Sequence, residues 1–312
     1  MIYAYLFSLD IKETATASPV TVIENDMAEF PYEVKRIRQD MTEQERLDMG
    51  PNWRAMKKCA KDPRLQRRHG QPPFPAYTTY MKLATVVKEF DLQCTRFCAL
   101  ADGPGSMSCY LLAKFPASTG VGITLRDEDK SWAWMPSLQD DPRFTSLEGD
   151  INATDTIKRL GKDFDFCVAD GGMQEKENQE VEATGLLMRE VWIAISILRP
   201  GGTFVMKIYD TLTDESHLML WALAHCFETV QVTHGITLRP NNAERYLLCQ
   251  NLRKDRMHLT DEYSHSFVAF MVAQNKRSYD LQLTCRIAHE LQLVSFPETG
   301  TEEYVKNYIE NL

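Results

Sequence analysis

The sequence has no apolar stretch long enough to span a bilayer, so we predict no membrane partner. Residues 1–7 are apolar, but the stretch is short and lacks a basic flank, which predicts that it is not a signal peptide. None of the eight cysteines belongs to a paired C-x-x-C pattern, so no metal site is predicted. Several cysteines lie inside apolar strand patterns, which is typical of buried thiols in a reducing, intracellular compartment. The sequence does not distinguish the nucleus from the cytoplasm or from a viral factory.

Basic residues are not in excess, because the 312 residues carry a formal net charge of −9 at pH 7. This balance argues against nucleic-acid binding over the whole surface, but it allows a local basic path. Such a path lies in residues 53–70, where Asp62 is the only acid. Its basic side chains are Arg54, Lys57, Lys58, Lys61, Arg64, Arg67 and Arg68. We interpret the segment either as a solvated helix face or interaction tail, or as a contact for a polyanion that feeds a nearby site.

A regular alternation of strand and helix patterns begins near residue 76 and ends near residue 252. The predicted strands are 97–101, 121–125, 144–147, 164–170, 203–207, 229–233 and 244–249, and the main predicted helices are 80–90, 179–198 and 215–226. This alternation predicts an α/β fold with a mostly parallel sheet and helices on both faces. The last two strands leave no room for a helix between them, so they should form an antiparallel hairpin. We therefore expect an N-terminal extension (1–75), an α/β domain (76–252) and a C-terminal helical extension (253–312).

Charged residues stand at the ends of three predicted strands. Lys207 ends the strand 203–207, Asp170 closes another strand, and Glu244 opens a third. Lys82 lies on the predicted helix that precedes the first strand. Burying an unpaired ammonium is costly, and ligands bind at the carboxyl ends of parallel strands. Lys207 is therefore either a solvated strand end or a working group, and we expect the four charges to converge at one edge of the sheet.

A turn that contains two glycines, residues 101–106, follows the first predicted strand and precedes a helix that begins near Met107. Doubly wound sheets hold nucleotide-type cofactors at this position, although a plain tight turn would look the same. The sequence lacks the G-x-G-x-x-G pattern, and the second strand ends in Leu125-Arg126 without the acid that usually grips a ribose. Asp150, after the third strand, is placed to bind an adenine amino group or to cap a helix over 152–160. A cofactor without a pyrophosphate, such as S-adenosylmethionine, fits this pattern better than NAD.

These features together resemble the FtsJ-type RNA 2′-O-methyltransferases, whose signature is a Lys-Asp-Lys-Glu tetrad on a Rossmann-like sheet. Within that family the chain is similar to the eukaryotic and viral mRNA cap 2′-O-methyltransferases, and the similarity covers about residues 76–252. The motifs that carry it are Ala101–Ser106, Gly122–Leu125, Gly149–Ile151, Ala169–Gly172, Gly201–Lys207 and Arg239–Tyr246. The resemblance implies a mostly parallel seven-stranded sheet with an antiparallel terminal hairpin. It does not separate a cellular from a viral origin.

The resemblance also implies a reaction, in which a methyl group passes from S-adenosylmethionine to the ribose 2′-hydroxyl of the first transcribed nucleotide of capped RNA, converting cap 0 to cap 1. The implied catalytic tetrad is Lys82, Asp170, Lys207 and Glu244. Lys207 is expected to act as base or proton acceptor, with its pKa lowered by burial and by the second cation, Lys82. The implied cofactor-binding residues are Asp102, Gly103, Gly105, Ser106, Asp150 and Asp170.

RNA contacts are expected from basic side chains at Arg54, Lys57, Lys58, Arg64, Arg67, Arg68, Arg239 and Arg245. The aromatic candidates for stacking on a methylated cap guanine, each of which fits core packing as well, are Trp132, Trp134, Tyr209 and Phe74. Two other functions fit the same fold, namely 2′-O-methylation of ribosomal or transfer RNA and RNA binding by a catalytically silent homologue. An NAD-dependent oxidoreductase is disfavoured by the missing dinucleotide loop. A partner in a capping or polymerase complex and the oligomeric state stay open.

Overall fold

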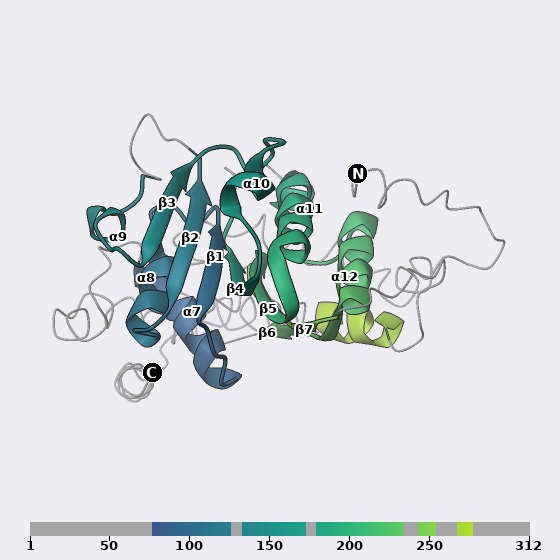
Figure 1. The fold of residues 1–312 in the computed structure, drawn as a ribbon. Helices are drawn as coiled ribbons and strands as arrows, with labels where there is room; N and C mark the ends of the chain where they lie inside the picture. The colour runs from purple at the N-terminus through teal and green to yellow at the C-terminus, as the bar shows by residue number, and fades with distance from the viewer. Residues whose placement is uncertain (1–76, 126–132, 173–178, 234–242, 254–266, 277–312) are drawn as a thin grey trace, which may run out of the picture.

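The computed structural model describes residues 77–125, 133–172, 179–233, 243–253 and 267–276, and these residues form one seven-stranded sheet (Figure 1). Its strands are β1 (Arg96–Leu100), β2 (Thr119–Thr124), β3 (Phe144–Glu148), β4 (Phe164–Ala169), β5 (Leu198–Ile208), β6 (Phe227–Thr233) and β7 (Arg245–Leu252). The strand order is β3-β2-β1-β4-β5-β7-β6, with β1 to β5 all parallel to one another. β7 lies between β5 and β6 and runs antiparallel to both. The predicted mostly parallel sheet with an antiparallel terminal pair is therefore confirmed.

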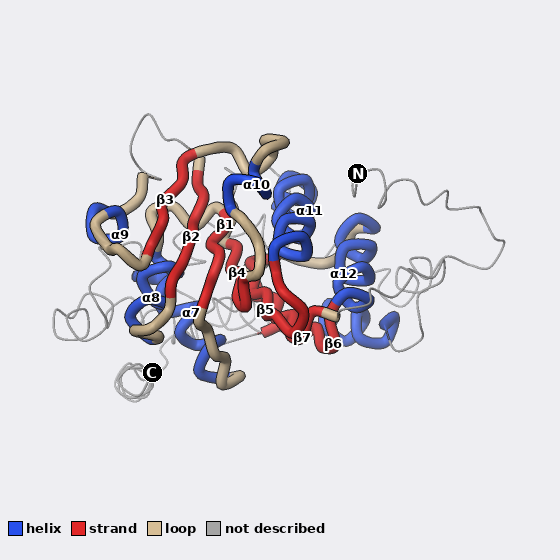
Figure 2. The backbone as a smooth tube through the Cα atoms, in the orientation of Figure 1, coloured by secondary structure: helices blue, strands red, loops and turns tan. Residues whose placement is uncertain are grey.

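Helices cover both faces of this sheet, as Figure 2 shows. They are α7 (Tyr77–Glu89), α8 (Ser106–Lys114), α9 (Pro136–Gln139), α10 (Thr156–Leu160), α11 (Gln179–Ile197) and α12 (Asp214–Cys226). One core cluster joins the sheet to α10, α11 and α12, and a second joins its other face to α7, α8 and α9. Within the described part of the chain, no helix is long and apolar enough to cross a membrane.

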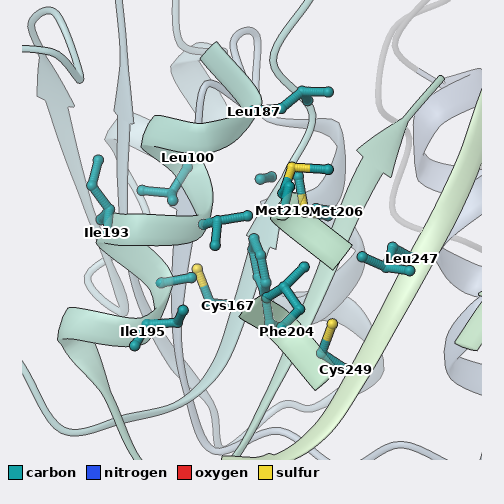
Figure 3. Packing of buried hydrophobic residues seen from close by; sticks show 14 of the residues in the cluster. Leu100, Cys167, Leu187, Ile193, Ile195, Phe204, Met206, Met219, Leu247 and Cys249 are labelled. Atoms are coloured by element: carbon teal, nitrogen blue, oxygen red, sulfur yellow. The ribbon is translucent and has the colours of Figure 1, made fainter. Parts of the chain in front are cut away.

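The central strands are mostly apolar because helices bury both of their faces. In β1, Leu100 points into the cluster under α11, whereas its neighbour Ala99 belongs to the opposite cluster. Figure 3 shows the first of these clusters, where Leu100 of β1 and Phe204 and Met206 of β5 meet Leu187 of α11. β4 and β5 lie in the middle of the sheet and are packed on both faces. Asp170 directly follows β4, and Lys207 is the penultimate residue of β5.

Two predicted boundaries are wrong for local reasons. Residues 199–202, which lie between the predicted helix 179–198 and the predicted strand 203–207, are part of β5. A shift in the β4–β5 register lets Phe164 pair with Leu198 while Phe166 pairs with Thr203. The helix expected over 152–160 begins only at Thr156, with Asp155 as its N-cap residue. Asp150 is not a helix cap, because its carboxylate accepts hydrogen bonds from the backbone and side chain of Asn152 in a local turn.

A helix at residues 267–276, beyond the predicted α/β domain, packs beside α12 and is drawn in yellow in Figure 1. Its Phe267 and Met271 belong to the core cluster under α11 and α12, and the Phe267 ring lies 4.8 Å from that of Trp221. Asn275 accepts a hydrogen bond from the Thr211 hydroxyl at 2.7 Å and donates one to the Thr211 carbonyl at 2.8 Å. This helix is therefore part of the packed core, while the proposed division of the chain at residue 252 stays a prediction.

We expect Met271→Ala to lower the free energy of unfolding by about 2–5 kcal/mol, because it leaves a cavity where a fully buried side chain stood. Chemical denaturation of the full chain measures the change. Ala273→Ser, on the exposed side of the same helix, is the matched control and should stay within about 0.5 kcal/mol of wild type. Equal stability of the two variants would contradict the packing of this helix into the core.

Candidate active site

The ends of β4 and β5 bring Asp170 and Lys207 together. Ala169 and Met206 are partners in the parallel β4–β5 pair, so the next residue of each strand lies at the same edge of the sheet. The Lys207 ammonium lies 3.1 Å from Oδ1 of Asp170 and donates a hydrogen bond to the Asp170 carbonyl at 3.0 Å. The Lys207 side chain is only 12% exposed. The first of the two interpretations of Lys207, a solvated strand end, is therefore wrong.

Lys82 and Glu244 form a second ion pair beside the first. Lys82 comes from α7 and Glu244 immediately precedes β7, so the pair joins positions 162 residues apart. Their side chains are 10% and 14% exposed, respectively. The four residues of the predicted tetrad thus meet at one edge of the sheet, as two ion pairs of opposite charges. Their catalytic roles stay a prediction.

Tyr246 connects these pairs, and the sequence analysis assigned it no role. It is the cross-strand partner of Lys207 in the β5–β7 pair, and its hydroxyl donates a hydrogen bond to Oδ1 of Asp170 at 3.0 Å. Burial, together with the negative charges of Asp170 and Glu244, raises the pKa of the Tyr246 phenol. Tyr246 is therefore neutral and acts as a donor that orients the Asp170 carboxylate. The sequence signal for a role of Tyr246 was its position in the motif Arg239–Tyr246, two residues after Glu244.

The expected lowering of the Lys207 pKa is not what the structure shows. Burial does lower the pKa of this ammonium, but the negative charges around it, chiefly that of Asp170, outweigh burial and leave the pKa raised. The expectation overlooked that the second cation is already neutralised, since Lys82 is paired with Glu244. In the protein without ligands, Lys207 is a charged group held by a carboxylate.

The glycine turn after β1 is held by Asp102. The Asp102 carboxylate accepts hydrogen bonds from the backbone N–H groups of Met107 and Ser108 and from the Ser108 hydroxyl, at 2.7–3.0 Å. It thereby satisfies two donors in the first turn of α8, while burial raises its pKa to about 7. Gly105 has φ +109°, and a Cβ there would collide with Leu138 of α9, so the turn requires glycine at this position. The predicted cofactor contacts of Asp102, Gly103, Gly105 and Ser106 stay predictions.

The turn after β4 also depends on close packing. Oε1 of Glu190, on α11, accepts a hydrogen bond from the Gly171 backbone N–H at 3.0 Å. A Cβ at Gly171 would overlap this carboxylate, and a Cβ at Gly172 would lie 3.3 Å from the Lys207 ammonium. The two glycines therefore let the chain pass between Glu190 and Lys207. Glu190 was not singled out from the sequence, since an acid within a helix pattern carries no signal of a contact 19 residues away.

Most of the predicted RNA-binding residues lie outside the described residues, namely Arg54, Lys57, Lys58, Arg64, Arg67, Arg68 and Arg239. The same holds for Trp132 and Phe74. Arg245 is described, but it is only 4% exposed, and its guanidinium donates a hydrogen bond to the Glu244 carbonyl. Trp134 and Tyr209 are likewise buried, and the Trp134 indole donates to the Leu147 carbonyl. All three side chains are buried in this structure, and their predicted RNA contacts stay predictions.

The sequence of this chain is similar to those of known methyltransferases. A family model described as FtsJ-like methyltransferase matches residues 79–252. A cap-specific mRNA (nucleoside-2′-O-)-methyltransferase of Autographa californica nuclear polyhedrosis virus is 26% identical over 239 residues, which are 72% of this chain and 87% of the viral protein. The cap-specific mRNA (nucleoside-2′-O-)-methyltransferase 1 of Danio rerio is 35% identical over 172 residues. That match covers 48% of this chain but only 21% of the zebrafish protein.

Among solved structures, a Plasmodium falciparum protein described as a ribosomal RNA methyltransferase superposes with a TM-score of 0.45 at 18% identity. The superposition covers 56% of this chain and 96% of the other.

Proposed function

Because the chain belongs to the FtsJ-like methyltransferase family, we propose that it methylates the ribose 2′-hydroxyl of the first transcribed nucleotide of capped RNA. The observation that carries the proposal is the convergence of Lys82, Asp170, Lys207 and Glu244, from four separate elements, into two adjoining ion pairs. The similarity to two cap-specific mRNA methyltransferases supports the choice of capped RNA as the substrate. The match to the zebrafish protein covers only 21% of that relative. The substrate and the partners of the whole protein are therefore part of this proposal.

The residues at this edge fit S-adenosylmethionine as the cofactor. Asp150 and Asp170 stand just beyond the ends of β3 and β4, where their carboxylates suit a ligand with positive charge and with hydroxyl or amino groups. A dinucleotide would instead bring a pyrophosphate toward these acids. We propose that Asp150 holds the adenosine end and Asp170 the methionine end, with Gly103, Gly105 and Ser106 lining the turn between them. When bound, S-adenosylmethionine supplies a methyl group on a positively charged sulfur.

Lys207 is proposed to contact the 2′-hydroxyl, because it lies at the strand edge beside the residue assigned to the methionine end. The hydroxyl must lose its proton as it is methylated, and only a neutral amine can accept that proton. In the ligand-free protein the charge of Asp170 opposes the neutral form. A positive charge placed next to Asp170 offsets this carboxylate and lowers the pKa of Lys207. Lys207 would thus become an effective acceptor only when the site is filled, while Asp170 and Tyr246 keep its ammonium in place.

Alignment of the hydroxyl is the second contribution of the site. Holding two reactants in line removes much of the entropic cost of their encounter, and a well-placed base adds about 10²- to 10⁴-fold in rate. The Lys82–Glu244 pair borders the first pair, since the Glu244 charge acts on Lys207, and we assign it to orientation of the substrate ribose.

The substrate is tested by transfer of labelled methyl groups from S-adenosylmethionine to three matched RNAs. One carries an unmethylated cap, one carries an N7-methylated cap, and one is uncapped. We expect transfer to one or both capped RNAs and none to the uncapped RNA. Equal labelling of the uncapped RNA would reassign the protein to structured RNA such as ribosomal or transfer RNA. Absence of transfer to all three, with cofactor bound, would favour a silent homologue and contradict the proposal.

The acids around Lys207 predict a pH dependence. Glu244→Gln removes one negative charge that raises the pKa of Lys207 and leaves Lys82 without its carboxylate partner. Both changes favour neutral Lys207, so its pKa should fall and the rising limb of kcat against pH should move to lower pH. Assays between about pH 6 and pH 10 measure this shift. Glu228→Gln, on the exposed side of β6, is the control that should not move the limb. A limb that moves to higher pH in Glu244→Gln would contradict the assigned sign.

A further inference from the structure

Two consecutive residues of α11, Arg189 and Glu190, hold the two loops that contain the proposed cofactor residues. Both side chains are buried, although each carries an ionisable group in the middle of a long helix that packs against the sheet. A buried charged group is costly unless it is paired or hydrogen-bonded, so each of them needs a structural explanation. Neither residue belongs to the tetrad or to the motifs identified in the sequence.

Arg189 is fastened to the loop after β3. Its Nε donates a hydrogen bond to the Ile151 carbonyl at 2.7 Å, and one of its terminal nitrogens donates to the Ala153 carbonyl at 2.9 Å. The guanidinium also stacks over the Trp192 ring, 4.0 Å from its centroid, which limits its freedom to turn away. The Ile151 carbonyl lies within the Asp150–Asn152 turn and the Ala153 carbonyl directly follows it, so Arg189 is hydrogen-bonded to the loop that carries the Asp150 carboxylate.

Glu190 is fastened to the loop after β4. One carboxylate oxygen accepts the hydrogen bond from the Gly171 N–H, whereas the other is fully buried and has no hydrogen-bond partner among the described residues. Burial raises the pKa of Glu190 to about 8, against the lowering effect of the Lys207 charge. The charged or titratable groups that act on it are Lys207 on β5, Asp170 after β4 and the Cys167 thiol on β4. An acid that is largely neutral near pH 7 can occupy this position at low cost.

We propose that α11 sets the separation of the two ends of the cofactor site, with Arg189 as the positioning residue for the Asp150 loop and Glu190 as the positioning residue for the Asp170–Gly172 turn. Because the residues are adjacent on one rigid helix, the two loops are held in a fixed relation to each other. Loops of this kind are otherwise more mobile than the elements that they connect. The proposal rests on the proposed function, since it takes Asp150 and Asp170 as the cofactor's two anchors.

The two residues should have separable effects. Arg189→Met removes two hydrogen bonds from a charged donor and should raise the Kd for S-adenosylhomocysteine by about 10-fold. The value of kcat at saturating cofactor should stay within about 3-fold of wild type, because Lys207 and Asp170 are not disturbed. Glu190→Ala should instead lower kcat by about 100-fold, since a small displacement of Asp170 disturbs the reacting geometry. Its Kd for S-adenosylhomocysteine should rise less than that of Arg189→Met, because the Asp150 anchor stays held by Arg189.

Conservative variants and a control distinguish positioning from general damage. Glu190→Gln keeps an oxygen that accepts the Gly171 hydrogen bond, so it should restore most of the activity that Glu190→Ala loses. Arg189→Lys reaches only one carbonyl and should give an intermediate Kd; it replaces Arg189→Met if that variant does not fold. Ser196→Ala removes a hydroxyl that bonds within the same helix, to the Trp192 carbonyl, and should behave as wild type.

The experiment measures Kd by calorimetry, kcat on capped RNA, and hydrogen exchange of the Gly171 amide by NMR. Faster exchange in Glu190→Ala but not in Glu190→Gln is expected. Equal losses of Kd and kcat in the Arg189 and Glu190 variants, or no rescue by Glu190→Gln, would overturn the proposal. If the wild-type chain methylates no RNA, the proposed function fails, while the Kd and the Gly171 exchange still decide the role of α11.

Discussion

Lys207→Ala is expected to reduce methyl transfer by about 10²- to 10⁴-fold, the range that a positioned base contributes. The variant loses the only amine that the structure places against the Asp170 carboxylate among the described residues. S-Adenosylhomocysteine should still bind, because the glycine turn and the Asp150 loop do not contact Lys207. Single-turnover transfer to capped RNA measures the first effect, and calorimetry measures the second.

The control for this variant is Lys162→Ala. Lys162 is exposed and lies just before β4, at the opposite end of that strand from Asp170. It should keep wild-type turnover. Near wild-type turnover in Lys207→Ala would show that Lys207 is no more than a structural partner of Asp170. Loss of cofactor binding together with turnover would instead mean that the ion pair holds the cofactor site itself.

Asp170→Asn is expected to lower kcat by about 10- to 100-fold. The change removes a charged acceptor that holds both the Lys207 ammonium and the Tyr246 hydroxyl, and hydrogen bonds to charged groups contribute about 1.5–3 kcal/mol each. It also removes the main charge that raises the pKa of Lys207. The residual activity should therefore reach its maximum at a lower pH than that of wild type.

Asp165→Asn is the matched control for Asp170→Asn. Asp165 lies on the same strand, at its other end, where it accepts hydrogen bonds from the backbone N–H groups of Thr95 and Arg96 and pairs with Arg199. Its replacement should lower stability without changing the pH dependence of kcat. If both variants shifted that pH dependence equally, the shift could not be assigned to the Asp170–Lys207 pair.

Sequence patterns were sufficient for the strands and for the meeting of the tetrad. The central strands are mostly apolar, and Asp170, Lys207 and Glu244 stand at strand ends that the sheet topology brings to one edge, whereas Lys82 lies within α7. The antiparallel terminal pair followed from the short connection between its strands. The insertion of β7 between β5 and β6 did not, because strand order depends on packing between distant segments.

The details of the site could not be read from single positions. The pKa of Lys207 depends on which acid pairs with which lysine, and the sequence does not contain this pairing. Arg245 was expected at the surface because arginine usually is, yet its backbone position in β7 places the side chain in the interior. Glu190 and Arg189 contact loops 19 and more than 30 residues away, so only the folded chain reveals their contacts.

The central claim is 2′-O-methylation directed by the Lys207–Asp170 pair. The most direct test is digestion of capped RNA that the protein has methylated, followed by mass spectrometry of the cap-proximal fragment. We expect one added methyl group on the ribose of the first transcribed nucleotide, and none with Lys207→Ala. A methyl group on a base, on the cap guanine or on an internal ribose would contradict the account.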